Sequence, residues 1–188
     1  MKSIYLLPIF KRLGLSFILT TVVLPANSWA ALDAVMRVVH ATSGPIEGPV
    51  SVSGLGAGFI KVIGFSENIS AEFDQTTGLP TGKRQHRPVR IVKEIDQTSP
   101  RIRQALYDGG TLSSVTVRFL RPNPDSGATE IFYLVTLTNA HVVSIIPNHI
   151  SVEPGLNVPE TETISLTYEK MNTQWLDTLE GSLGIWQE

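Results

Sequence analysis

The chain has 188 residues, of which 42% are hydrophobic and 17% are charged, and these proportions are typical of one globular domain with a single core. It contains no cysteine, which excludes a disulfide framework, a thiolate nucleophile and a thiolate metal site. Lysine and arginine total 15 against 17 acidic residues, so the formal charge is −2.

Residues 1–30 have the pattern of a secretory signal peptide. Basic residues precede an uncharged apolar stretch over 13–24, and Ser28 and Ala30 are the small residues expected before a cleavage point. The apolar stretch is shorter than the roughly 20 residues that a membrane-spanning helix needs. We therefore expect cleavage after Ala30 and a secreted or periplasmic domain over 31–188. An uncleaved anchor is one alternative. A start codon placed too far upstream is another, and it would imply assembly in the cytoplasm before export.

The expected mature domain is acidic. Residues 31–188 contain 12 basic and 17 acidic residues, a formal charge of −5. Binding to nucleic acid or to an anionic membrane surface requires a basic surface that neutralises phosphates. We therefore expect no nucleic-acid partner and no stable membrane association after signal cleavage.

Short apolar runs separated by turn residues predict a sheet-rich domain. In residues 32–38 the apolar side chains alternate on one face. Residues 59–65 and 131–137 are apolar at almost every position, so we expect them to lie centrally, covered on both faces or against a neighbouring subunit. In residues 69–73 the alternation predicts a half-buried strand.

The later strands follow the same alternation. Val115, Val117 and Phe119 predict one strand face. Residues 164–168 alternate apolar and polar positions, which suggests a late strand that closes the sheet. The glycine-rich and proline-rich segment 43–58 is a predicted loop region.

Only one segment has a convincing helical pattern. Ser99 is the expected N-cap, Pro100 suits the first helical position, and Gly109 suits a left-handed stop. One face of this helix is apolar and consists of Ile102, Ala105 and Leu106. A single apolar stripe predicts a helix packed on the outside or at one end of a barrel, and disfavours a parallel α/β fold.

No motif predicts a catalytic, cofactor-binding or metal-binding residue. The glycines of 54–58 are not followed by a helical pattern, so they do not form a dinucleotide fingerprint, and Ser66 lacks the final glycine of a nucleophile elbow. The histidines are too widely separated for a local zinc motif: His40, His86, His141 and His149. We expect His141 to lie in a strand.

Two carboxylate pairs and two tryptophans have simpler interpretations. The pairs, which we expect to be surface charges, are Glu94 with Asp96 and Glu160 with Glu162. Trp175 and Trp186 are expected to find a partner surface, by subunit contact or by folding back onto the domain, because an exposed indole is costly.

The segment 77–100 is the most informative part of the chain and reads TGLPTGKRQHRPVRIVKEIDQTSP. It joins a basic loop punctuated by glycine and proline to a strand pattern and the helix start. Alone, its five cations could form a phosphate or nucleic-acid patch, or simply a solvated face. The acidic balance of the domain disfavours nucleic acid.

This segment resembles the haemolysin-coregulated protein (Hcp) family, the ring-forming tube subunit of bacterial type VI secretion. The resemblance extends to LDAVMRV at 32–38, PIEG at 45–48, RPNP at 121–124, LTNAHVVSI at 137–145 and ISLTYEK at 164–170. It implies a mainly β fold, an antiparallel β-barrel of two packed sheets with one α-helix. It also implies hexameric rings that can stack into a tube and carry small effector proteins, without catalysis or a cofactor.

The resemblance also implies that the basic loop projects from the barrel and makes contacts within or between stacked rings. The subunit-interface candidates are Leu79, Pro80, Lys83, Arg84, Gln85, His86 and Arg87. Family members ordinarily lack a signal peptide and polymerise in the cytoplasm, so the leader predicted here is a departure from the family.

Two other classes share parts of this pattern. A periplasmic or secreted β-barrel binding or adhesion module, not part of a secretion tube, would have the same strand pattern and remain monomeric. A small secreted hydrolase would require a nucleophile and a base, which the sequence does not offer.

Overall fold

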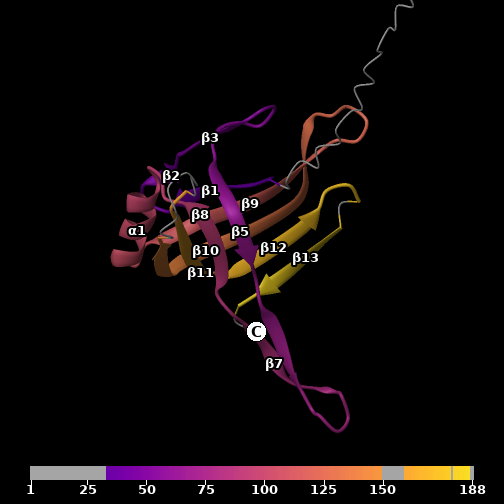
Figure 1. The fold of residues 1–188 in the computed structure, drawn as a ribbon. Helices are drawn as coiled ribbons and strands as arrows, with labels where there is room; N and C mark the ends of the chain where they lie inside the picture. The colour runs from indigo at the N-terminus through magenta and orange to yellow at the C-terminus, as the bar shows by residue number, and fades with distance from the viewer. Residues whose placement is uncertain (1–32, 150–158, 179, 187–188) are drawn as a thin grey trace, which may run out of the picture.

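The computed structural model describes residues 33–149, 159–178 and 180–186, and the predicted signal peptide lies outside them (Figure 1). Strands and one helix follow each other along these residues in the order β1 (Asp33–His40), β2 (Gly44–Ile46), β3 (Gly48–Val52), β4 (Gly56–Gly58), β5 (Ile60–Ser66), β6 (Ile69–Phe73), β7 (Pro80–His86), β8 (Val89–Glu94), α1 (Ser99–Tyr107), β9 (Thr111–Pro122), β10 (Thr129–Asn148), β11 (Thr161–Thr167), β12 (Lys170–Trp175) and β13 (Glu180–Ile185).

The main sheet curls round into a barrel. Its strand order is β11-β8-β5-β1-β9-β10-β12-β13, and β11 also pairs with β10, so the pairing path returns on itself. Strand β10 makes this possible because its first half pairs with β12 and its second half with β11. Every strand pairing is antiparallel. The predicted mainly β fold with one helix and a late closing strand is confirmed for the described residues.

The barrel interior is filled by the alternating apolar positions. From β1 the buried side chains are Ala34, Met36 and Val38, and β9 contributes Val115 and Val117. This pattern follows because successive side chains of a strand point to opposite faces. The alternation in the sequence therefore identified the inward face of both strands correctly.

Strand β5 lies centrally, between β8 and β1, as its apolar character predicted. Ile60 and Val62 are buried in the core, whereas Lys61 and Ile63 face outward, and Ile63 is 48% exposed. Among the described residues, β5 is thus covered on only one face around Ile63.

Helix α1 lies at one end of the barrel (Figure 1). Ile102 and Ala105 are buried, and Gly109 adopts a φ of 60° that ends the helix, as predicted. The prediction for Ser99 was wrong, because the N-cap residue is Thr98 and Ser99 is the first helical residue. The Ser99 hydroxyl accepts hydrogen bonds from the Asp96 amide and from a buried lysine instead. Within the described residues no helix is long and apolar enough to cross a membrane.

Two small hairpins leave the barrel wall. Strands β3 and β4 fold over the outside of β1 and β5, where Val35, Phe59 and Leu120 form a second apolar cluster. Strands β6 and β7 point away from the barrel. The prediction that 69–73 is half-buried was therefore wrong, since all five residues of β6 are exposed. Its apolar alternation belongs to a free hairpin, which has no core to face.

Candidate subunit-contact hairpin

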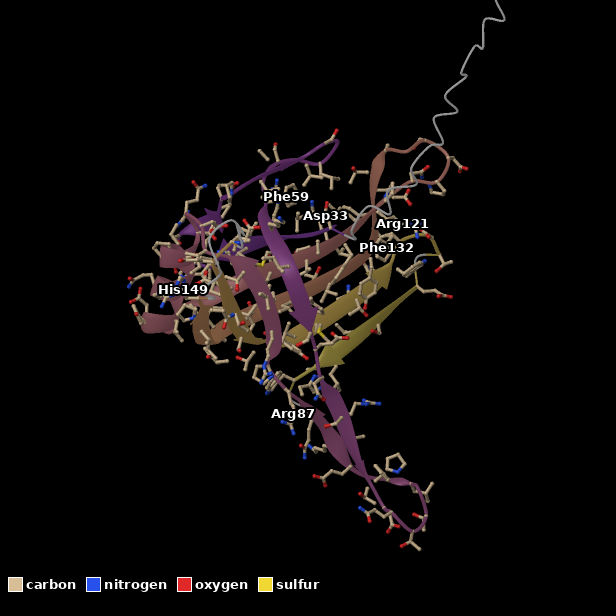
Figure 2. The ribbon with its side chains drawn as sticks, in the orientation of Figure 1. Asp33, Phe59, Arg87, Arg121, Phe132 and His149 are labelled. Carbon is tan, nitrogen blue, oxygen red and sulfur yellow. The ribbon has the colours of Figure 1, made fainter. Side chains whose placement is uncertain are left out.

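The projecting hairpin β6–β7 contains the residues for which the sequence predicted subunit contacts. The two strands pair from Ile69 opposite His86 at the root to Phe73 opposite Pro80 near the tip. Figure 1 shows the hairpin extending from one side of the barrel, and the sticks of Figure 2 show polar side chains along its length, with Arg87 at the root. The candidates all lie in this one element: Leu79, Pro80, Lys83, Arg84, Gln85, His86 and Arg87.

The tip presents apolar side chains to solvent on an ordered turn. Phe73 is 62% exposed and Leu79 is 64% exposed. Asp74 Oδ1 accepts hydrogen bonds from the amides of Thr76 and Thr77 at 2.7 and 2.8 Å. These bonds lower the pKa of Asp74. An exposed apolar tip held by a specific turn is suited to contact with another protein surface.

The root of the hairpin is anchored to the barrel by an aromatic cluster. His86 Nδ1 lies 2.8 Å from the Tyr168 hydroxyl, and the Tyr168 ring packs edge-on against Trp186 with 5.0 Å between ring centres. Burial, with a smaller contribution from the charge of Glu67, raises the pKa of Tyr168 to about 12. The Arg87 amide also donates to a backbone oxygen across the hairpin. The hairpin thus projects from a fixed base.

The two tryptophans have different surroundings. Trp186 folds back onto the barrel at the hairpin root, which is one of the two outcomes predicted for it. Trp175 packs edge-on against Phe132 with 5.3 Å between ring centres and remains 38% exposed. Trp175 therefore still presents part of its indole to solvent.

A buried ionic cluster holds the barrel to the start of α1. Lys93 Nζ lies 3.2 Å from Glu162 Oε1, 3.0 Å from Asp96 Oδ1 and 2.9 Å from Ser99 Oγ. Arg103 Nη2 lies 3.3 Å from the second oxygen of Glu162. This cluster explains the KEIDQTSP sequence in structural terms, because the strand end, the turn and the helix start share one lysine.

The interpretation of Glu162 as a surface charge was wrong, since its side chain has no exposed area. A signal for this was present in the sequence. Lys93 follows Val89 and Ile91 at intervals of two, and Glu162 precedes Ile164 and Leu166 in the same way. Both charged residues are therefore in phase with the inward face. A lysine and a glutamate in phase with buried positions on two strands predict a buried pair.

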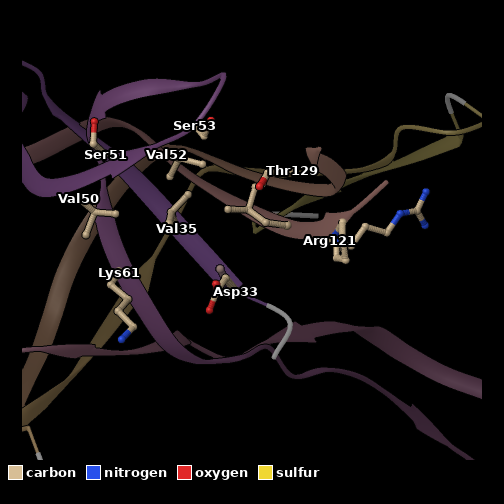
Figure 3. A pocket seen from close by; sticks show the side chains of 12 residues that line it. Asp33, Val35, Val50, Ser51, Val52, Ser53, Lys61, Arg121 and Thr129 are labelled. Carbon is tan, nitrogen blue, oxygen red and sulfur yellow. The ribbon is translucent and has the colours of Figure 1, made fainter. Parts of the chain in front are cut away.

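A groove of about 420 Å³ lies under the β3–β4 hairpin (Figure 3). Its floor includes Val35 and Leu120, and its rim includes Asp33, Lys61 and Arg121. Both cations are already engaged, because Lys61 pairs with Glu94 and Arg121 pairs with Glu130 and Asp177. No group of three or more metal-ligating side chains occurs in the described residues. The groove therefore has the character of a surface hollow.

These features define a class of protein: a curled antiparallel β-barrel with an end helix and a projecting hairpin anchored at its root. A family model described as "Type VI secretion system effector, Hcp" matches residues 39–175. The "Major exported protein" of Pseudomonas aeruginosa is 32% identical over 127 residues, which cover 66% of this chain and 72% of that protein. The chain belongs to the Hcp family of type VI secretion.

Solved structures of the family have the same fold. "Crystal structure of Hcp protein" superposes with a TM-score of 0.76 at 23% identity, over 84% of this chain and 99% of that one. The Hcp1 protein from E. coli EAEC 042 gives 0.72 at 26% identity, over 83% and 99% of the two chains. The secreted protein Hcp3 from Pseudomonas aeruginosa gives 0.66 at 22% identity, over 82% and 99%. The shared barrel confirms the fold that the sequence resemblance implied.

Proposed function

We propose that this chain is a structural, ring-forming subunit of the type VI secretion tube type, and that it acts by assembly and not by catalysis. The single observation that carries this proposal is membership of the Hcp family across residues 39–175. Family members form hexameric rings that can stack into a tube and hold small effector proteins. The same assembly and the same class of cargo are proposed for this chain.

The shape of the chain supports assembly through the hairpin β6–β7. A closed ring or a stack of rings requires each subunit to present two different surfaces that fit each other. The hairpin offers one such surface, since Phe73 and Leu79 are exposed at its tip and its root is fixed by His86 and Tyr168. We assign the interface candidates of β7 to contacts within or between rings.

The family assignment favours this function over the alternative of a monomeric binding or adhesion module. The two differ in a simple property, the mass of the purified protein. Size-exclusion chromatography with light scattering should give the mass of a hexamer. Electron micrographs of the same material should contain annular particles. A monomer at every concentration would contradict the proposal.

The role of the hairpin is tested with two matched leucines. Leu79 and Leu183 are 64% and 62% exposed, and only Leu79 lies on the hairpin. Leu79→Asp should weaken ring formation, because it places a charge in an apolar contact. Leu183→Asp should assemble as the wild type does. Equal loss in both variants would remove the hairpin from the interface.

Export is the second part of the proposal. We propose that residues 1–30 are removed as a signal peptide and that residues 31–188 reach the periplasm or the medium. The name of the relative, "Major exported protein", supports a proposal of export from the cytoplasm. Terminal sequencing of the protein made in its host tests this. A mature protein that still begins upstream of Ala30 would contradict cleavage there.

A further inference from the structure

Two arginines lie against one buried aromatic ring on the outside of the barrel. The Cζ atoms of Arg37 and Arg118 are 4.4 and 5.1 Å from the centre of the Phe59 ring. Phe59 has no exposed area. In the β1–β9 register Arg37 is opposite Thr116 and Arg118 is opposite Val35, so the two guanidinium groups are diagonal neighbours on one sheet face.

The positive charge of this pair is not compensated within the described residues. Neither guanidinium forms an ion pair there, and Arg118 forms no hydrogen bond there. Arg37 Nη2 donates a hydrogen bond to the Ala57 carbonyl at 2.6 Å, and the buried Nε of Arg37 has no partner in the described part of the chain. Burial and the neighbouring charge of Arg37 lower the pKa of Arg118.

Such an arrangement is unfavourable in an isolated chain. Both side chains are half-buried, so water solvates their charges incompletely, and the two like charges repel each other. Buried donors in native proteins are normally satisfied, and a guanidinium binds a carboxylate through two parallel hydrogen bonds. None of the described residues therefore supplies an anionic partner for this site.

We infer that Arg37 and Arg118 form the basic half of a subunit contact and bind an acidic side chain of a second copy of this chain. This inference rests on the proposed ring-forming function. The partner copy has the required chemistry, because residues 31–188 carry a formal charge of −5. Arginine is also enriched among the residues that dominate binding energy at protein interfaces.

The position of the pair suits a second contact surface. Figure 2 labels Phe59 on the barrel, well apart from Arg87 at the hairpin root. A subunit with the hairpin in one place and the arginine pair in another has two different contact surfaces. A ring built from a single repeated contact needs two different surfaces on each subunit.

Arg118→Gln is the most informative variant, because Arg118 has no hydrogen bond to lose among the described residues. In the full chain it should raise the subunit dissociation constant about tenfold, the effect of losing one charged hydrogen-bonded contact. At low protein concentration its unfolding temperature should stay within about 3 °C of the wild type, since a lost cation–π contact offsets the relieved repulsion. Arg118→Lys keeps the charge and loses the planar guanidinium group. Its subunit dissociation constant should lie between those of the wild type and Arg118→Gln.

The matched control is Arg101→Gln, an exposed arginine on α1. Both variants remove one positive charge, so a difference in their assembly reports the site and not the net charge. Light scattering over a concentration series at low and high salt measures assembly of each. Weakening in Arg118→Gln with unchanged assembly in Arg101→Gln supports the inference.

Three results would overturn it. One is assembly of Arg118→Gln at the wild-type dissociation constant, and another is equal weakening by Arg101→Gln. The third is a rise in the unfolding temperature with inorganic phosphate, seen in the wild type and lost in Arg118→Gln while assembly is unchanged, which would indicate a free-anion site. A wild-type chain that stays monomeric would refute the ring function itself, a result distinct from these three.

Discussion

Lys93 and Glu162 face each other in register across β8 and β11, and neither side chain has any exposed area. Their charged atoms are 3.2 Å apart. Lys93 also contacts Asp96 and Ser99, so the pair joins the barrel wall to the start of α1. Because water is excluded, each charge depends on the other groups of the cluster for its stabilisation.

Glu162→Gln should lower the free energy of unfolding by about 3 kcal/mol, because it leaves the Lys93 charge buried with fewer compensating groups. The measurement is urea denaturation of the full chain under conditions that keep it monomeric. A double substitution, Lys93→Met with Glu162→Met, should recover a large part of the loss, since it removes both charges at once.

The control for this prediction is an exposed pair that lies next to the start of β11. Glu160 Oε1 lies 2.9 Å from His149 Nδ1, and the two side chains are 61% and 72% exposed. Glu160→Gln should leave the unfolding free energy nearly unchanged, because exposed ion pairs are screened by solvent. Equal losses in Glu160→Gln and Glu162→Gln would contradict the role assigned to the buried pair.

The acid stability of the chain should depend on Asp96. Burial alone would raise its pKa, but hydrogen bonds from Thr98 and Lys93 outweigh burial and hold the pKa below its ordinary value of 3.8. In the folded state the carboxylate therefore holds its proton less tightly than in the unfolded state. Its contribution to stability is complete above pH 3.8 and is lost as the pH falls through the lower folded value.

Asp96→Asn removes this contribution at every pH. Above about pH 5 the variant should be less stable than the wild type by a constant amount, and the difference should shrink as the pH falls below 3.8. Denaturation curves of both proteins over a pH series measure the difference in unfolding free energy. Asp74, Glu130 and Glu169 also have lowered pKa values, but they are present in both proteins, so their effects cancel in this difference. A difference that stays constant to the lowest pH would show that Asp96 has no such shift.

The sequence predicted the burial of the barrel strands better than that of the hairpin that projects from the barrel. Strands β1 and β9 have one face against the core, so hydrophobic alternation identifies their buried residues directly. Strand β6 has the same alternation, yet its five residues are exposed, because alternation records the spacing of apolar residues and not the presence of a core. Whether a second layer covers a strand depends on contacts far apart in the chain.

The candidate site also has parts that the sequence could predict and parts that it could not. The β7 residues were found together because they are consecutive in the sequence, whereas the root contact between His86 and Tyr168 joins positions 82 apart. The proximity of Arg37 and Arg118 likewise depends on the register of β1 and β9, which no local pattern specifies. Glu162 differs, because its phase with Ile164 and Leu166 was visible in the sequence.

The Tyr168 hydroxyl should contribute to stability at the hairpin root. Tyr168→Phe keeps the ring against Trp186 and removes the contact with His86 at 2.8 Å, so the unfolding free energy should fall by about 1 kcal/mol at neutral pH. The pKa of Tyr168 is raised from 10.0 to about 12, so its neutral form is favoured in the folded state. This contribution is complete below pH 10 and is lost as the pH rises towards 12.

The alkaline arm of the experiment separates this effect from general loss of packing. Wild-type stability should fall more steeply between pH 10 and 12 than that of Tyr168→Phe. Tyr107→Phe is the matched control, because Tyr107 is 72% exposed on α1. Parallel pH profiles for Tyr168→Phe and the wild type would show that the hydroxyl is not held in this way.

The order of the hairpin tip should depend on Asp74. Asp74→Ala removes the acceptor of the Thr76 and Thr77 amides, so these two amides should exchange hydrogen faster while the barrel amides keep their rates. Assembly should weaken as well, because a mobile tip loses more conformational entropy on contact. Amide exchange with mass spectrometry and light scattering on the same samples measure the two effects together.

Asp125→Ala is a suitable control, since Asp125 lies in the exposed β9–β10 turn and its carboxylate forms no hydrogen bond within the described residues. Faster exchange at the tip with unchanged assembly would separate tip order from ring contact.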